Sequence, residues 1–151
     1  DLIIAFKAGV ADTISGGAGN DTIFAWTGND TLKGGAGNDI LAGEGGADIL
    51  TGGSGQDVFV SHRGDLGTYV DRITDFDANE GDVIDLSSLI DNGSAAQGAI
   101  NNYVQAVNQG GDTMIQVRAN GSGAWTNAIL VEGHTNMNIQ TLLNNGNLDV
   151  T

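Results

Sequence analysis

A nine-residue unit repeats six times without interruption over residues 7–60, and this period constrains the fold more than any other feature of the chain. The units (nonads) read KAGVADTIS, GGAGNDTIF, AWTGNDTLK, GGAGNDILA, GEGGADILT and GGSGQDVFV. Their sixth position is always Asp, and their eighth position is always Ile, Leu or Phe. A flexible Gly-Asp-Asn linker does not explain two such positions kept in register, so the pattern predicts a stack of equivalent repeats.

Each nonad divides into a turn and a strand. The first six positions are rich in Gly, which permits positive φ and lets carbonyl oxygens converge on one point. The last three positions predict a very short strand whose eighth side chain points inward, because side chains alternate along a strand. Two nonads then make one coil, so alternate Asp residues stack on the same side. The two predicted columns are Asp21, Asp39 and Asp57, and Asp12, Asp30 and Asp48.

The stacked Asp residues indicate a bound metal ion. Successive turns of one column lie about 4.8 Å apart, the ordinary strand spacing. Bare carboxylates at that distance repel each other by about 3 kcal/mol if the effective dielectric is about 20. A cation that takes about six to eight oxygen ligands removes this repulsion. The repeat contains no His or Cys, so zinc lacks its ligands, and magnesium disfavours flexible cages of carbonyls. The pattern therefore predicts Ca²⁺ as the cofactor.

The metal-free repeat is predicted to be unfolded. One inward apolar side chain per nonad buries little surface in relation to the backbone entropy that ordering removes. Turns rich in Gly lose more of that entropy than other segments do. Folding is therefore expected to depend on calcium binding.

The composition limits the partners. The chain of 151 residues carries 19 Asp and Glu against 5 Lys and Arg, a net charge of −14. This charge disfavours nucleic acid and anionic membrane surfaces. No apolar run reaches the length of about 18 residues that a membrane span requires, and the absence of Cys excludes a disulfide framework. The end of the period predicts a boundary between residues 1–60 and residues 61–151.

Residues 61–151 have the pattern of a β-rich cap. Strand-like segments at 103–109, 113–120 and 124–133 are separated by the turns NQGGD and NGSG, which predicts an antiparallel meander. A short helix is predicted next, with Asn138 as its N-cap and Gly146 as its C-cap. The segment NLDV then predicts a final strand. This half is expected to pack on the last turn of the repeat and to cover its open end.

An acidic turn within residues 69–90 is a further candidate for metal binding. Asp75, Asp77 and Asn79 imitate the first three ligands of an EF-hand loop, but the Gly and Glu that such a loop requires are out of place. An EF-hand is therefore not expected. A calcium site that Asp75 and Asp82 share with the last repeat turn, and a solvated acidic turn, are both compatible with the sequence.

The nonads, followed by DRITDFDANEGDVIDLSSLI, GDTMIQVRANGSG and LLNNGNLDV, resemble the C-terminal end of RTX proteins exported by type I secretion. The most similar subclass is the secretion-target domain that ends large repetitive bacterial adhesins. RTX proteases, lipases and alginate epimerases carry related caps. The resemblance covers nearly the whole chain and implies an all-β fold, with a parallel β-roll (RTX β-helix) followed by a β-rich capping region with a short C-terminal helix. It also implies an uncleaved secretion signal within 142–151, which the type I secretion apparatus would contact transiently.

The resemblance implies calcium sites between successive turns of one column, formed by carbonyl oxygens and two Asp side chains. In the first column, Gly16, Ala18 and Asp21 would face Gly35, Gly37 and Asp39, and Gly34, Ala36 and Asp39 would face Gly53, Gly55 and Asp57. In the second, Ala25, Thr27 and Asp30 would face Glu44, Gly46 and Asp48, and Lys7, Gly9 and Asp12 would face Trp26, Gly28 and Asp30. The candidate metal residues also include Gly43, Gly45, Gly52, Asp75 and Asp82. In the second column Val10 replaces a Gly, and Ala25 and Trp26 replace a Gly pair.

The resemblance implies a non-catalytic, calcium-binding module that folds after export and supports type I secretion of a large bacterial surface adhesin or exoprotein. It would be extracellular or at the cell surface, as a monomeric part of a longer chain. The sequence contains no HExxH, GxSxG or Cys nucleophile, which disfavours an enzyme. The alternatives are an accessory module of a secreted protease, lipase or alginate epimerase, and a polysaccharide-binding module that uses its Trp side chains.

Overall fold

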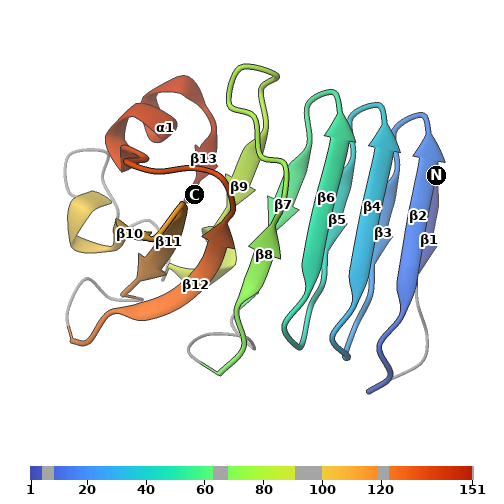
Figure 1. Cartoon of the computed structure of the whole chain (residues 1–151), viewed down its shortest axis with the longest axis horizontal. Helices are drawn as coiled ribbons and strands as arrows, with labels where there is room; N and C mark the ends of the chain where they lie inside the picture. Colours follow the sequence, from blue (N-terminus) through green and yellow to red (C-terminus); the bar gives the residue numbers. More distant parts are fainter. Residues whose placement is uncertain (5–8, 63–67, 91–99, 119–122, 151) are drawn as a thin grey trace.

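The computed structural model describes residues 1–4, 9–62, 68–90, 100–118 and 123–150. The fold is all-β with one short helix, as predicted, and it has two sheets (Figure 1). The first sheet consists, in order, of β1 (Leu2–Ile4), β3 (Thr22–Phe24), β5 (Ile40–Ala42), β7 (Val58–Val60), β9 (Val83–Asp85) and β13 (Leu148–Asp149). The second consists of β10 (Val104–Gln109), β11 (Asp112–Val117), β12 (Thr126–Val131), β8 (Asp71–Ile73), β6 (Ile49–Ser54), β4 (Thr31–Ala36) and β2 (Thr13–Ala18).

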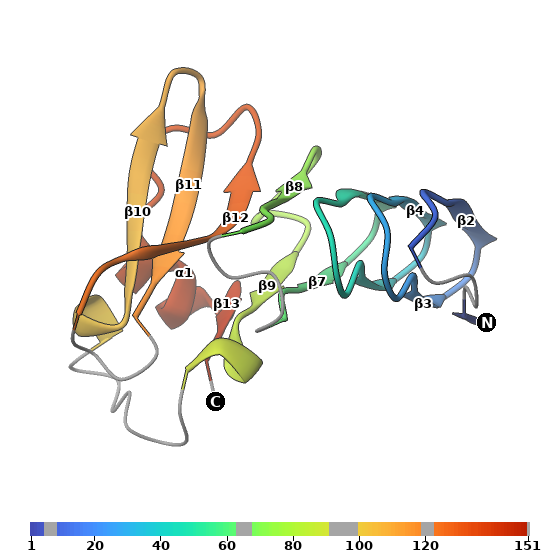
Figure 2. The ribbon, with the colours of Figure 1, turned by 90° about the horizontal axis from the view of Figure 1, so that it is seen from below.

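The nonads form a parallel β-roll, in which the chain alternates between the two sheets. Figure 2 shows these coils from below, with the N-terminus at the open end. Thr13 pairs with Thr31 and Thr22 pairs with Ile40, so each coil takes two nonads. The inward residues of the eighth position, Ile23, Leu32, Leu41, Leu50 and Phe59, are completely buried. The roll therefore has the narrow apolar core that the repeat predicts.

The expectation of very short strands is wrong for one of the two sheets. Strands β3, β5 and β7 span three residues each, but β2, β4 and β6 span six. The longer strands include the Gly-Gly pair at the start of the next turn, because Gly17 pairs with Gly35 and Gly35 with Gly53. Without a Cβ, these glycines keep the ladder while they take positive φ.

The roll continues beyond the last nonad. Strand β8 pairs in parallel with β6, and β9 pairs in parallel with β7, so one further coil closes over residues 71–85. Ile73 and Ile84 are completely buried and continue the row of inward apolar side chains. The sequences Asp71-Arg72-Ile73 and Asp82-Val83-Ile84 repeat the Asp-x-apolar triplet of the nonads.

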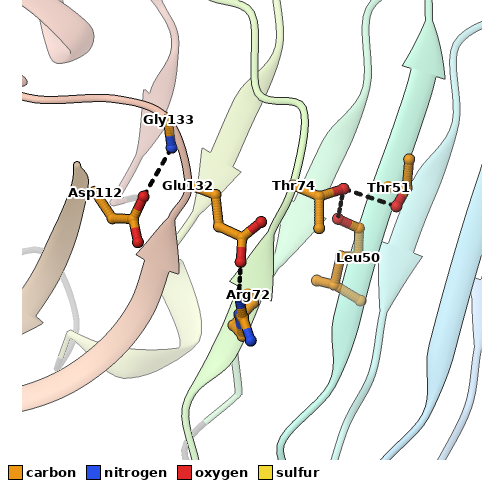
Figure 3. Close-up of polar contacts among 7 residues, drawn as sticks. All are labelled: Leu50, Thr51, Arg72, Thr74, Asp112, Glu132 and Gly133. Atoms are coloured by element: carbon orange, nitrogen blue, oxygen red, sulfur yellow. Dashed lines mark hydrogen bonds and ion pairs between the residues drawn. The ribbon is translucent and has the colours of Figure 1, made fainter. Parts of the chain in front are cut away.

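Strand β8 joins the roll to the cap (Figure 3). On its roll side, Thr74 Oγ1 donates to the carbonyl of Leu50 at 3.2 Å and lies 2.8 Å from Thr51 Oγ1. On its cap side, β8 pairs in parallel with β12, and Arg72 forms an ion pair with Glu132. The second sheet is therefore continuous from the roll into the cap.

The cap has the elements that the sequence predicts. Strands β10, β11 and β12 form the antiparallel meander, which stands at the end of the roll away from the N-terminus (Figure 2). Helix α1 (Ile139–Asn145) begins where the Asn138 side chain accepts a hydrogen bond from the Thr141 N–H, and it ends at Gly146, whose φ is 80°. Strand β13 then pairs in parallel with β9. Two single turns of 3₁₀ helix, Ser87–Leu89 and Ile100–Asn102, complete the elements of the described residues. No helix in this part of the chain is long and apolar enough to cross a membrane.

Candidate calcium sites

The repeat Asp residues stack in the two columns that the sequence predicts. In each column, the backbone N–H of one Asp donates to the Oδ1 of the next Asp along the roll, over 2.7 to 3.0 Å. Both columns extend past the last nonad, to Asp82 in one and Asp71 in the other. Oδ1 of the accepting Asp thus fixes the spacing between successive turns of a column.

Four of the stacked Asp residues have a second carboxylate oxygen without a hydrogen-bond partner among the described residues. Oδ2 of Asp21, Asp30, Asp39 and Asp57 is buried and accepts no hydrogen bond from the described residues. A buried carboxylate with an unsatisfied oxygen costs several kcal/mol, because it has lost its water and gained nothing in exchange. Such oxygens, directed into the stack between turns, fit a hard divalent cation.

The first Gly of the nonads leaves the space in which these oxygens lie. A Cβ at Gly16 would lie 2.5 Å from Asp21 Oδ2 and 2.7 Å from the carbonyl oxygen of Gly34. At Gly34, Gly43 and Gly52 a Cβ would likewise collide with Oδ2 of the Asp of the same nonad. Because these glycines have no Cβ, space is left beside them in which carboxylate and carbonyl oxygens lie close together.

The backbone carbonyl groups at the third and fourth positions of the nonads have different surroundings. The carbonyl oxygens of Gly19 and Gly37 lie close to the next turn of their column, and the carbonyl of Val10 takes the same place in the other column. The Gly-to-Val replacement therefore preserves this carbonyl direction. The carbonyls of Thr27, Ala36 and Gly45, at the third position, accept N–H groups from the preceding turn.

The departures from the repeat leave the second column with a different backbone arrangement. The carbonyl of Trp26 is directed at the next coil, where its oxygen accepts the N–H of Gly45 at 2.6 Å. Thr27 and Gly45 form an isolated parallel bridge. Asp30 and Asp48 are nevertheless buried in register with the first column's Asp residues. Lys7 lies outside the described residues.

The acidic turn lies directly on the last repeat turn. Asp82 is 3% exposed, and its Oδ1 accepts the N–H of Asp57 at 3.0 Å. Asp75 binds differently: its two oxygens accept the N–H groups of Gly52 and Gly53, at 2.9 and 2.8 Å. Asp82 therefore continues the first column, whereas Asp75 accepts hydrogen bonds from backbone N–H groups in the second half of β6.

Three features of these sites were missed in the sequence. Asp71 extends the second column, and the signal that would have found it is the triplet it forms with Arg72 and Ile73. Glu80 accepts the N–H of Gly55 at 3.2 Å. The third feature is a second ladder, formed by the fifth-position side chains that precede the Asp residues. Its carbonyl oxygens, on Asn20, Asn29 and Asn38, accept the backbone N–H of Asn38, Ala47 and Gln56.

Side chains alone do not make a metal centre here. Within the described ranges, no group of three or more Asp, Glu or His side chains is arranged to hold a metal ion. A site between two turns would combine two Asp carboxylates with backbone carbonyls. This donor set contains only oxygen, which suits calcium.

Three carboxyl groups of the columns, those of Asp30, Asp57 and Asp82, have raised pKa values. Burial raises the pKa of Asp57 to about 6, against a lowering effect of the hydrogen bond from Asp39 N–H, and the negative charges of Asp82, Asp39 and Asp75 raise it further. Burial also raises the pKa values of Asp30 and Asp82. Each shift reflects the cost of keeping a carboxylate ionised without a cation.

Calcium affinity is expected to fall as the pH falls below about 6. Because the pKa of Asp57 in the metal-free fold lies above its ordinary value of 3.8, protonation stabilises that fold as the pH drops from about 6 towards 4. Calcium needs the ionised form, so protons compete with it within the closed roll, and the folded chain should hold calcium at sites that use Asp57 about tenfold more weakly at about pH 5. Calcium titrations at several pH values, followed by circular dichroism, measure this effect. A midpoint independent of pH between about 7 and 5 would contradict it.

Comparisons with known proteins agree with this geometry. The family model of the RTX calcium-binding nonapeptide repeat matches residues 9–41 and 27–59. No curated protein matches the chain in sequence. The chain is similar to the AlgE6R3 subunit of the Azotobacter vinelandii mannuronan C5-epimerase, whose solution structure is known, with 30% sequence identity and a TM-score of 0.68. The match covers 97% of this chain and 81% of that subunit. The AlgE6R2 subunit of the same epimerase, 24% identical, shares the fold with a TM-score of 0.55 over 83% of this chain and 84% of that one.

The family match and the fold assign the cofactor. RTX nonapeptide repeats bind calcium, and the buried oxygens of the two Asp columns suit that ion. The similarity to the AlgE6R3 subunit extends beyond the nonads and includes the cap. The chain belongs to the RTX family of calcium-binding nonapeptide-repeat proteins.

Proposed function

We propose that the chain is a non-catalytic module that folds on binding calcium after export and supports type I secretion of a large bacterial surface adhesin or exoprotein. The observation that carries the proposal is the row of buried Oδ2 atoms of Asp21, Asp39 and Asp57, which have no hydrogen-bond partner among the described residues, together with Oδ2 of Asp30 in the other column. The ligands would be the carbonyls and carboxylates of the turn pairs named above, with Asp82 completing the first column. Residues 1–60 would act as the calcium-binding part, and residues 61–151 as the cap that carries the secretion signal.

The proposed mechanism couples metal binding to folding. Bound calcium supplies positive charge and oxygen coordination between the turns. Where calcium is scarce, the stacked carboxylates repel one another, and the chain stays extended enough to pass an exporter. Extracellular calcium modules have dissociation constants of about 10⁻⁴–10⁻³ M. The emerging chain would therefore fold only outside the cell, and folding would oppose its return.

The cap supports this proposal through its contacts with the last turn. The Asn147 side chain donates to the carbonyl of Asp82 at 2.8 Å and to that of Ala78 at 3.3 Å. Strand β13 follows directly and pairs with β9. The proposed secretion signal would thus be packed away when the roll folds, which suits a signal that is read only during export. Thr151 lies outside the described residues.

A second candidate function is favoured by the similarity to an epimerase subunit. The chain would then be an accessory module of a secreted enzyme, or would bind a polysaccharide. Catalytic chemistry would then lie elsewhere in the protein, because Asp30, Asp57 and Asp82, whose pKa values are raised, belong to the stacked columns. Binding of a mannuronan polymer to the calcium-loaded chain would favour this alternative.

An export assay tests the main proposal. The chain would be fused behind a reporter in cells with a type I exporter, and the folded reporter outside the cells would be measured with and without external calcium. External calcium is expected to raise the yield, and Asp39→Asn is expected to reduce that gain. Asp112→Asn, which removes a carboxylate far from the columns, serves as the matched control. Export that is independent of external calcium would contradict the coupling.

A further inference from the structure

One corner of the roll carries large side chains where the repeat normally has glycine. At the second position of the nonads, one column has Gly17, Gly35 and Gly53. The other column has Trp26 and Glu44 at the corresponding positions. Both residues have left-handed backbones, with φ of 69° and 71°. A backbone of this kind is unfavourable for residues with a Cβ, and such outliers cluster at ligand sites.

The two side chains are neighbours in adjacent coils. Trp26 lies two residues after the end of β3, and Glu44 lies two residues after the end of β5. The N–H of Gly45 donates to the carbonyl of Trp26 at 2.6 Å, which keeps the two turns in register. The Trp26 side chain is 55% exposed, so it is not a core residue. The fold therefore holds a Trp and a Glu side by side on its surface at the cost of two strained residues.

These residues line a small hollow. Its volume is about 180 Å³, and its lining residues are Ile4, Phe24, Trp26 and Glu44. Of these four described residues, three are apolar, two of them aromatic, and Glu44 carries the charge. His62 Nε2 lies 3.7 Å from Oε1 of Glu44. The hollow thus combines two aromatic side chains and a carboxylate, in a chain whose net charge is −14.

We propose that this hollow binds an organic cation with an apolar body, such as an alkylammonium group. Aromatic faces attract cations through their quadrupole, and a nearby carboxylate adds direct charge attraction. The same chemistry is presented by a small quaternary ammonium compound and by the Lys side chain of a protein. The ligand would contact the side chains of Trp26 and Glu44, whereas calcium would use backbone carbonyls of the same turn, so the hollow adjoins the calcium sites without sharing their oxygens.

Fluorescence of the calcium-loaded chain tests the proposal. Trp125, which stacks under Arg118 at 3.9 Å, would be replaced by Phe so that Trp26 is the only tryptophan. Choline would be compared with its neutral isostere 3,3-dimethyl-1-butanol, and a Lys-containing peptide with the same peptide carrying norleucine. All ligands would be compared at one fixed pH. Saturable binding of choline, of the Lys peptide or of both, in preference to the neutral partner, is expected with a dissociation constant of about 1–10 mM.

Substitutions locate the binding. Glu44→Gln is expected to weaken it about fivefold, and Trp26→Tyr is expected to weaken it about two- to fivefold. Glu132→Gln, which removes one negative charge at the junction with the cap, should leave it unchanged. Trp26→Gly restores the glycine of the repeat and should abolish binding. Because this variant has no tryptophan left to report by fluorescence, its binding of choline would be measured by calorimetry. Each variant would first be shown by circular dichroism to be folded in calcium. Equal binding of cation and neutral isostere, absence of saturable binding, or binding that survives Trp26→Gly would overturn the proposal.

Discussion

An excess of calcium chelator is expected to convert the far-UV circular dichroism of this chain from a β spectrum to that of a disordered chain. The buried Oδ2 atoms of Asp21, Asp39 and Asp57 have no partner among the described residues, and they stack within one column. Removal of calcium leaves these charges to repel one another in a core that is one side chain wide. The loss should exceed the stability of the fold, which for a domain of this kind is about 5–15 kcal/mol.

The chelation experiment has two internal controls. Restoring calcium should restore the β spectrum, which excludes irreversible damage. Magnesium at the same concentration should not, because it requires a tight octahedral shell and releases its water reluctantly. A complete β spectrum in excess chelator would show that the roll is a static scaffold whose folding does not depend on the metal.

The largest effect of a single substitution is expected for Gly34→Ala. The added methyl group would collide with Asp39 Oδ2 and would lie 2.7 Å from the carbonyl oxygen of Gly52. Gly34 does not have positive φ, so the effect would come from the lost space and not from backbone strain. Overpacking costs about 1–3 kcal/mol, and displacement of a shared metal ligand adds to this. We expect the calcium needed for folding to rise by at least about tenfold.

Gly111→Ala is the matched control for this substitution. Gly111 also lacks positive φ, and a Cβ there would meet no atom within 4 Å. It lies in the turn between β10 and β11, far from the Asp columns. Calcium titrations of both variants, followed by circular dichroism, allow the comparison. Equal midpoints would show that the space beside Asp39 is not needed for the metal.

The roll could be predicted from the repeat because the constant period of nine residues determines where each side chain lies in the coil. A fixed Asp and a fixed apolar residue in every nonad place the carboxylates in columns and the apolar side chains in the core. Leu32, Leu41 and Leu50 are completely buried as this pattern requires. The meander and the helix were also predictable, since local turn and cap chemistry marks their ends, as with Asn138 and Gly146.

The continuation of the columns was harder to predict because the spacing changes. Within the nonads, stacked Asp residues are 18 apart, but Asp48 and Asp71 are 23 apart, and Asp57 and Asp82 are 25 apart. Longer connections break the period while the Asp-x-apolar triplet is kept. Alternation around the acidic turn did not reveal that β8 and β9 lie in different sheets. The parallel pairing of β8 with β12 is a contact distant in sequence, which no local pattern records.

The most direct test of calcium-coupled folding is the number of calcium ions bound per chain, measured by isothermal titration calorimetry on chelated protein with circular dichroism recorded in parallel. The stacked columns predict several ions per chain, taken up cooperatively together with the β spectrum. Asp39→Asn should remove more than one of them, because Asp39 lies between Asp21 and Asp57 in its column. A single bound ion, or calcium uptake without a change of structure, would contradict the claim that the metal holds the turns together.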